Sequence, residues 1–321
     1  MEVIPSLFRT KNGVNILKTR FLLAAVLLFC GITDVLAQQE SQYTQYMYNA
    51  NTINPAYSGT RGVLSFNSTL RSQWMGLEGA PQTLSFSMNT PMGTKGVGIG
   101  MSYYNDRIGP TQENNMAFDF SYTFRVTYDA MLSLGLKGGV NNLDVNTDLL
   151  HLYNEFDPNM QPISVWSPTI GVGAYLHSHN WYLGLSTPNM LETDHYREVK
   201  VSTATEKAHF YLMGGYVFEM GPDWHFKPAF LGKAVSGAPL SVDISANFMY
   251  QEQFIVGASY RWDAAVSAMA GFQISDSIMI GYAYDYDTHD IGNFNSGSHE
   301  IFLQFELGTR QRDLRAKRCF F

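Results

Sequence analysis

Apolar and polar residues alternate in about fourteen short stretches of this chain, and residues 116–126 show the pattern most clearly. Alternate positions of this stretch are apolar or aromatic: Met116, Phe118, Phe120, Tyr122, Phe124 and Val126. The positions between them are small, polar or charged, and include Asp119 and Arg125. Successive side chains of a β-strand point to opposite faces, so each stretch predicts a strand with one apolar and one polar face.

The predicted strands number about fourteen. They cover Val63–Leu70, Gln82–Met88, Val97–Tyr104, Asn115–Val126, Met131–Leu136, Thr169–Leu176, Trp181–Thr187, His209–Phe218, His225–Leu231, Leu240–Met249, Phe254–Tyr260, Ala264–Ile274, Ile278–Tyr286 and His299–Leu307. Because the polar face carries charge and the pattern recurs almost to the C-terminus, a lipid-facing wall around a polar lumen explains it better than a soluble β-sandwich. The predicted fold is therefore all-β, a transmembrane antiparallel β-barrel over residues 61–309.

Short and long connections between the predicted strands alternate. The short ones are Asn89–Gly96, Thr127–Ala130, His177–Asn180, Glu219–Trp224, Tyr250–Gln253 and Ser275–Ser277. The long ones are Lys137–Pro168, Pro188–Ala208 and Asp287–Ser298, and the exceptions to the alternation are Gly232–Pro239 and Arg261–Asp263. Short periplasmic turns and long external loops are typical of outer-membrane barrels.

Residues 1–37 predict a cleaved signal peptide, and hence export to the outer membrane. Lys11, Lys18 and Arg20 precede the apolar run Phe21–Phe29, and small residues end the segment at Ala37. The run is too short to span a membrane and fits a secretory signal. Lipidation at Cys30 is disfavoured because Phe29 is too bulky for the position before a lipidated cysteine.

Composition agrees with a barrel and excludes some partners. Aromatic residues make up 14% of the chain, with 19 Tyr, and such residues form girdles at both membrane interfaces of barrels. The formal net charge of −7 argues against nucleic-acid binding. Only Cys319 follows the predicted signal peptide, so the mature chain has no intramolecular disulfide and no cysteine-based metal site.

Three segments resemble a known family. They are Gln42–Gly59, which reads QYTQYMYNANTINPAYSG, then Arg71–Thr83, RSQWMGLEGAPQT, and Asn105–Pro110, NDRIGP. Together they are similar to the PorP/SprF family of the Bacteroidetes type IX secretion system. The resemblance implies an outer-membrane barrel that serves protein secretion and gliding. It implies neither an enzymatic activity nor a cofactor. Its implied partners are outer-membrane lipid, a secreted adhesin or other type IX cargo, and periplasmic secretion proteins.

Residues 38–60 are expected to form a periplasmic N-terminal arm. Its candidate partner-binding residues are Tyr43, Tyr46, Met47, Asn54, Pro55 and Tyr57. The arm would dock into the lumen as a plug, or a periplasmic protein would capture it by strand addition, or it would remain a disordered leader. Packing within the barrel is the favoured alternative, because exposed clusters of Tyr and Met mark contact surfaces.

The connection between the first two predicted strands, residues 71–81, and the C-terminus hold further partner-binding candidates. Arg71, Trp74 and Glu78 are expected in an external loop, either touching a secreted partner or forming an Arg71–Glu78 pair with Trp74 on the rim. Residues 310–321 are expected to form a basic periplasmic tail. Its candidates are Arg315, Lys317, Arg318, Phe320 and Phe321. The tail would bind an acidic surface or lipid head groups, serve as an assembly signal, or stay solvated.

Other polar positions are assigned to the lumen. Charges predicted to face it are Asp119, Arg125, Lys137, Asp243, Asp285 and Glu306, and the glycines within Gly96–Gly100 are expected to leave room inside the wall.

The aspartates of Asp285–Asp290 lack the closing glutamate of a calcium loop, so no metal site is expected. The sequence has no Gly-x-Ser-x-Gly nucleophile motif, so no enzyme is predicted. The alternative function is a passive porin or hydrophobic-solute transporter.

Overall fold

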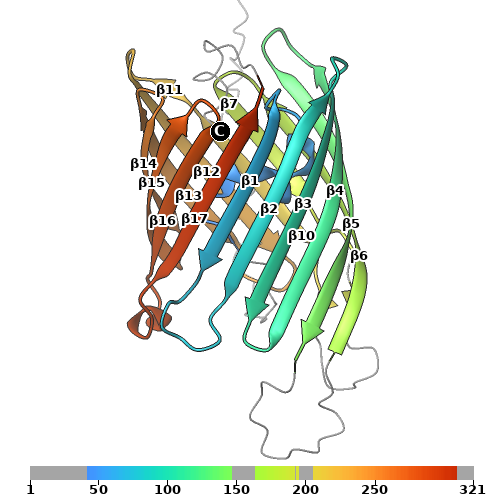
Figure 1. Cartoon of the computed structure of the whole chain (residues 1–321), viewed down its shortest axis with the longest axis vertical. Coiled ribbons are helices and arrows are strands. Elements are labelled where there is room, and N and C mark those ends of the chain that lie inside the picture. The colour runs from blue at the N-terminus through green and yellow to red at the C-terminus, as the bar shows by residue number, and fades with distance from the viewer. Residues whose placement is uncertain (1–41, 147–162, 192, 195–204, 309–321) are drawn as a thin grey trace, which may run out of the picture.

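The computed structural model describes residues 42–146, 163–191, 193–194 and 205–308, which form a closed antiparallel β-barrel (Figure 1). Its fourteen strands are β1 (Leu64–Ser72), β2 (Gln82–Met92), β3 (Val97–Ile108), β4 (Thr111–Arg125), β5 (Met131–Val145), β6 (Ile163–His177), β7 (Trp181–Thr187), β10 (His209–Tyr216), β12 (Trp224–Val235), β13 (Ser241–Tyr250), β14 (Phe254–Arg261), β15 (Ala265–Ser275), β16 (Ile278–Asp287) and β17 (Ser298–Leu307). The fold predicted from the alternating pattern is confirmed.

Each strand of the ring pairs with its neighbours in sequence order, and β1 closes the ring against β17. The closing register runs from Leu64 opposite Leu307 to Ser72 opposite His299. The short strand β11 (Phe218–Glu219) extends the pairing of β12 beyond the end of β10, and β8 (Thr193–Asp194) pairs with β9 (Thr205–Glu206) in a separate ladder. Pairing of the first strand with the last removes the two free edges that an open sheet would present.

The two mouths of the barrel differ in their connections. One mouth, here the turn mouth, carries the short connections 93–96, 126–130, 178–180, 251–253 and 276–277. The other, here the loop mouth, carries 73–81, 146–162, 188–208 and 288–297, the last including the short helix η4 (Asp290–Asn293). The turn mouth is at the top of Figure 1 and the loop mouth at the bottom.

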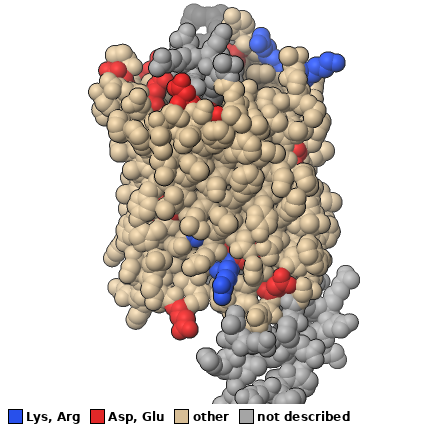
Figure 2. Space-filling model, viewed as in Figure 1, with Lys and Arg blue, Asp and Glu red and all other residues tan. Residues whose placement is uncertain are grey.

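The outer and inner faces of the wall have opposite character. Large apolar side chains such as Phe118 and Leu136 are exposed on the outside, at 58% and 61% of their surface. Their neighbours Asp119 and Lys137 point inward and are buried. On the face seen in Figure 2, Lys, Arg, Asp and Glu gather toward the two ends, and the middle of the outer surface is almost free of them. An apolar band around a polar interior is the arrangement that lipid requires of a barrel.

Three short helices lie inside the ring, in the blue segment of Figure 1: η1 (Tyr46–Tyr48), α2 (Ala50–Ile53) and η2 (Pro55–Tyr57). They carry much of the buried hydrophobic cluster of the molecule, together with inward side chains such as Met213 and Phe302. No helix among the described residues is long and apolar enough to cross a membrane.

The predicted boundaries were wrong mainly at the loop mouth. β5 continues to Val145 and β6 begins at Ile163, so the predicted connection Lys137–Pro168 is shorter than expected. β3 and β4 likewise extend until only residues 109–110 connect them. Beyond the lipid, outward side chains need not be apolar, so polar residues continue a paired strand there and break the pattern that identified it.

Candidate functional site

Residues 42–61 of the chain fill the lumen and are called the lumen segment here. They comprise the described part of the predicted arm, whose residues 38–41 lie outside the described residues. Almost all are buried, with Asn54 and Ala56 fully enclosed. The Asn54 side chain accepts a hydrogen bond of 3.0 Å from the Ala56 amide and caps η2, while Pro55 supplies a first helical residue that needs no hydrogen-bond partner.

The lumen segment runs along the barrel axis from the loop-mouth side to the turn mouth. Gln42 bonds to Ser241 and Asp243, which lie at the loop-mouth end of β13. Arg61 forms an ion pair with Glu306 at the turn-mouth end of β17. The segment therefore reaches nearly from one mouth to the other before the chain enters β1.

An ion network in the half of the lumen nearer the loop mouth holds the first residues of the segment. Arg71 Nη2 lies 2.6 Å from Asp285 Oδ2, and Arg71 Nη1 lies 3.0 Å from Glu300 Oε2. The amides of Thr44 and Gln45 each donate to a Glu300 carboxylate oxygen at 2.9 Å. The Thr44 hydroxyl lies 2.7 Å from both Asp285 oxygens. Each charge of the network thus meets an opposite charge or a hydrogen-bond donor.

Amide and hydroxyl groups hold the middle of the segment. Asn49 donates to Ser85 at 2.9 Å and accepts from Ser87 at 3.0 Å. Asn51 donates to Asp119 at 3.0 Å, and Lys137 lies 3.5 Å from that carboxylate. The Lys137 ammonium also donates to the carbonyl of Thr52 at 3.0 Å.

Glycines on the inner wall form a groove for the last third of the segment. A Cβ added to Gly98 on β3 would overlap the carbonyl of Ser58, and one on Gly135 of β5 would overlap the backbone of Pro55 and Ala56. Gly173 on β6 would overlap the Asn54 side chain in the same way. The prediction that glycines leave room inside the wall is confirmed at Gly98, and this groove explains why only glycine fits.

Aromatic rings fill the space between the polar contacts. Tyr48 stacks on Phe302 with ring centroids 4.0 Å apart, and Tyr57 meets the edge of Tyr175 at 5.5 Å. Burial raises the pKa of Tyr46 and Tyr48 well above the ordinary value of a phenol, so both stay neutral. These rings act as packing groups rather than as acids.

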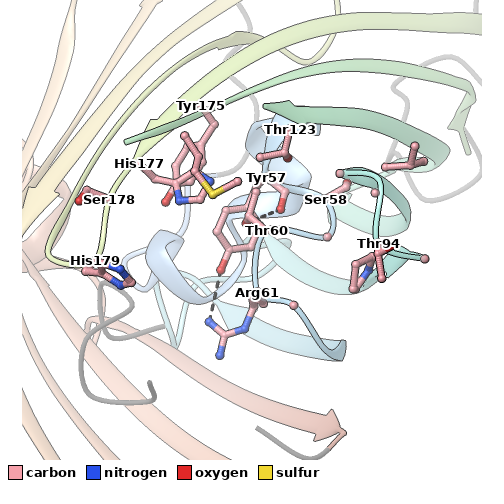
Figure 3. Close-up of a pocket in the computed structure, with 18 of the residues that line it drawn as sticks. Tyr57, Ser58, Thr60, Arg61, Thr94, Thr123, Tyr175, His177, Ser178 and His179 are labelled. Atoms are coloured by element: carbon pink, nitrogen blue, oxygen red, sulfur yellow. Dashed lines mark hydrogen bonds between the residues drawn. The ribbon is translucent and has the colours of Figure 1, made fainter. Parts of the chain in front are cut away.

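A cavity of about 260 Å³ opens beside the segment at the turn mouth (Figure 3). Tyr57 and Arg61 line it from the segment, His177 lines it from the end of β6, and His179 lines it from the turn that follows. The Arg61 guanidinium donates to the Tyr57 hydroxyl at 3.3 Å. Across the described residues, no group of three or more His, Cys, Asp or Glu side chains is placed to hold a metal ion.

The prediction for the first external loop was wrong for Arg71. Arg71 lies within β1, is 1% exposed and points into the lumen. Its carboxylate partners are Asp285 and Glu300, whereas the predicted partner Glu78 is exposed in the loop. Trp74 does lie in the loop, and its amide donates to the Ser298 hydroxyl at 3.2 Å.

The other predicted residues divide by location. Asp119, Lys137, Asp243 and Asp285 are buried in the lumen as predicted, whereas Arg125 is exposed at the turn mouth. The predicted tail residues Arg315, Lys317, Arg318, Phe320 and Phe321 lie outside the described residues, as does the predicted signal peptide.

Glu300 is a central residue of the network that was not predicted. Its position carried a signal, because Glu300 lies six positions before the predicted lumen residue Glu306 on one strand, and an even offset places both on the same face. The inward face of β17 is not uniformly polar, because it also carries Phe302, which stacks on Tyr48. This mixture obscured the alternation around Glu300.

The three segments that were compared with a known family lie in contact in the structure. Thr44 of the first bonds to Arg71 of the second at 3.1 Å. Thr83 of the second bonds to Asp106 of the third at 2.5 Å, and the Gly109 amide donates to the Gly79 carbonyl at 2.9 Å. They form one continuous region from the lumen to the loop mouth.

A closed fourteen-stranded ring, an apolar outer band and a lumen filled by its own chain define an outer-membrane β-barrel. The chain belongs to the family of the type IX secretion system membrane protein PorP/SprF, whose model matches residues 35–305. The predicted family is confirmed. A comparison with curated proteins found no match.

Solved structures of outer-membrane barrels resemble the chain at low identity. The Acinetobacter baumannii outer membrane protein Omp33 has a TM-score of 0.45 and 10% identity, over 77% of this chain and 100% of that one. The KdgM porin in complex with disordered oligogalacturonate has a TM-score of 0.37 and 6% identity, over 76% and 99% of the two chains.

Proposed function

We propose that this protein is a non-conducting outer-membrane component of the type IX secretion and gliding machinery. It supports the export or surface anchoring of a large adhesin and contacts periplasmic secretion proteins. Membership of the PorP/SprF family supports the type IX assignment. The single observation that carries the non-conducting role is the lumen segment, which occupies the space that a solute would cross.

The alternative, a passive porin or hydrophobic-solute transporter, needs a continuous path with favourable entry and exit sites. Two cavities beside the lumen segment have volumes of only about 50 and 40 Å³. Each holds a few water molecules at most. Contacts at both ends and in the middle of the segment also oppose its displacement by a passing solute.

The proposed orientation puts the turn mouth in the periplasm and the loop mouth outside the cell, as the lengths of the connections favour. Trp74 and Glu78 are then available to a secreted partner at the loop mouth. The cavity beside Tyr57 and Arg61 is available to periplasmic machinery. The basic tail, with Arg315 and Phe321, continues from the same mouth and is proposed as a second periplasmic contact.

Conductance in planar bilayers, measured on the full chain, tests the proposal. The protein should insert without giving stable channels, because the lumen segment blocks the path. A variant that lacks residues 42–61 is the matched control, and its channels would demonstrate that inserted barrels are detectable. Steady porin-like currents from the full chain would favour the alternative function.

A crosslinked pull-down from native envelopes provides the second arm of this test. Recovery of an adhesin or of type IX machinery proteins is expected, together with loss of adhesin display when the protein is deleted. Recovery of the barrel alone, with unchanged display, would contradict the secretion role even if the barrel does not conduct.

A further inference from the structure

A cavity of about 400 Å³ lies beneath the first loop at the loop mouth, apart from the lumen. Its lining includes Ser72, Gln73, Met75, Gln82, Arg107 and Gly109. The volume falls in the range of sites that hold small ligands or ligand head groups.

The wall residues of this cavity point away from the lumen. Thr83 and Asp106 are buried inside the barrel and bond to each other. Gln82 and Arg107 are their neighbours in sequence, so their side chains point to the outer face. The two lie directly opposite each other in the register of β2 and β3, and Ser72 lies opposite Gln82 on β1.

Arg107 is the one charged residue that lines the cavity. It is exposed, and within residues 42–146, 163–191 and 205–308 no ion pair is formed by its guanidinium. Its sequence neighbour Asp106 points into the lumen and bonds to Thr83. In register with Arg107, Asp144 lies two strands away through Gln112, and Glu78 lies in the loop. The cavity therefore presents an unneutralised cation surrounded by hydroxyl and amide groups.

The outer face next to the cavity is apolar. Leu70 and Leu84 point outward two residues from Ser72 and Gln82, and they are 50% and 45% exposed. Met75, which lines the cavity, is also exposed. The site thus places a guanidinium at the edge of the band that contacts lipid tails, which is the arrangement of a lipid head-group site.

We propose that this cavity binds the phosphorylated head group of a glycolipid in the outer leaflet. Arg107 would donate to the phosphate oxygens in the paired geometry that guanidinium groups favour, and Gln82 would add an amide donor. Leu70 and Leu84 would contact the acyl chains. The proposal rests on the proposed orientation of the loop mouth, but it does not depend on the secretion role.

Native mass spectrometry of the full chain in detergent tests this site with bisphosphorylated lipid A as the probe. Wild-type protein should bind this lipid, and Arg107→Gln should weaken binding about tenfold because a charge-assisted hydrogen bond is lost. Arg125→Gln removes an exposed arginine at the opposite mouth and is the matched control. The mobility of unheated protein on gels would verify that each variant remains folded.

A second variant, Gln82→Glu, keeps the guanidinium and adds a carboxylate directly across from it. It should weaken lipid A binding to a similar degree, since the added charge pairs with Arg107 and repels phosphate. Equal binding by wild type and both variants would overturn the proposal. So would equal binding of dephosphorylated lipid A, or inorganic phosphate bound as tightly as the lipid, which would assign the cavity to a free anion. None of these outcomes affects the conductance or pull-down results.

Discussion

The two halves of the lumen segment are held by different means. Residues 42–48 depend on side-chain charges and rings supplied by strands that include β1, β16 and β17. Residues 50–61 lie in the glycine groove of β3, β5 and β6, where the backbone of Pro55, Ala56 and Ser58 and the side chain of Asn54 leave no space for a Cβ. Asn51 and Arg61 add contacts with Asp119 and Glu306. The first half is therefore attached by charges and rings that one substitution changes, whereas in the second half close packing against glycine adds to the polar contacts.

The energetic consequences also differ. A buried ion network gains little net stability once the loss of water is included, yet removing one member leaves a charge without its partner. Close packing against glycine needs no charge compensation, but it tolerates no added atom. The first half is thus specified by pairing, and the second by exclusion of volume in addition to pairing.

The largest effect is expected from Arg71→Met, which leaves Asp285 and Glu300 buried without their cation. The free energy of unfolding should fall by about 3–5 kcal/mol. Urea titration of the barrel in detergent measures it, with Arg125→Met as an exposed control that should change by less than about 0.5 kcal/mol. Hydrogen exchange should increase in residues 42–48 more than in 50–61. A uniform increase over both halves would show that they are not held independently.

Gly135→Ala should increase hydrogen exchange in residues 50–61 more than in residues 42–48, because the new methyl group overlaps the backbone of Pro55 and Ala56. The expected loss is about 1–3 kcal/mol, with faster exchange confined to residues 50–61. Gly138→Ala on the same strand is the matched control, since its Cβ would meet nothing within 4 Å. If the two alanine variants are equally stable, the groove does not hold the segment.

The smallest effect should come from Asn54→Ala, which removes the cap of η2 and a 3.1 Å hydrogen bond to the Ala174 carbonyl. Thermal unfolding should report a loss of about 1 kcal/mol. Asn54→Ser keeps a cap acceptor but does not reach Ala174, so it should lose less. A serine variant as unstable as the alanine variant would assign the whole effect to the wall contact.

The strands could be predicted because lipid on one side and a polar lumen on the other impose the same two-residue period everywhere. The two-residue period is lost beyond the lipid, where outward side chains need not be apolar. Arg71 and its polar neighbours Ser72 and Gln73 were interpreted as a loop, because a charged inward residue near the end of a strand has the same pattern as a turn. Its burial depends on Asp285 and Glu300, which are more than 200 residues away in sequence.

Packing of the lumen segment within the barrel was predicted as the favoured one of three alternatives, without its path or its partners. Its residues have no strand period, and their partners lie on strands far along the chain, as in the contact of Asn51 with Asp119. The glycines were the better signal, because Gly98 and Gly100 alternate along one inward face and mark a place where another segment of the chain approaches closely. Neither the path of the segment nor the identity of its partners follows from local sequence.

The distribution of these partners has a consequence for how the barrel is built. The groove on β3, β5 and β6 comes from the first part of the wall to be synthesised, whereas Asp285 and Glu300 lie on its last two strands. Residues 50–60 can therefore meet their groove while the wall is still an open sheet, but Thr44, Gln45 and Arg61 find their carboxylates only when the final hairpin arrives. Formation of the ion network thus marks the completed ring.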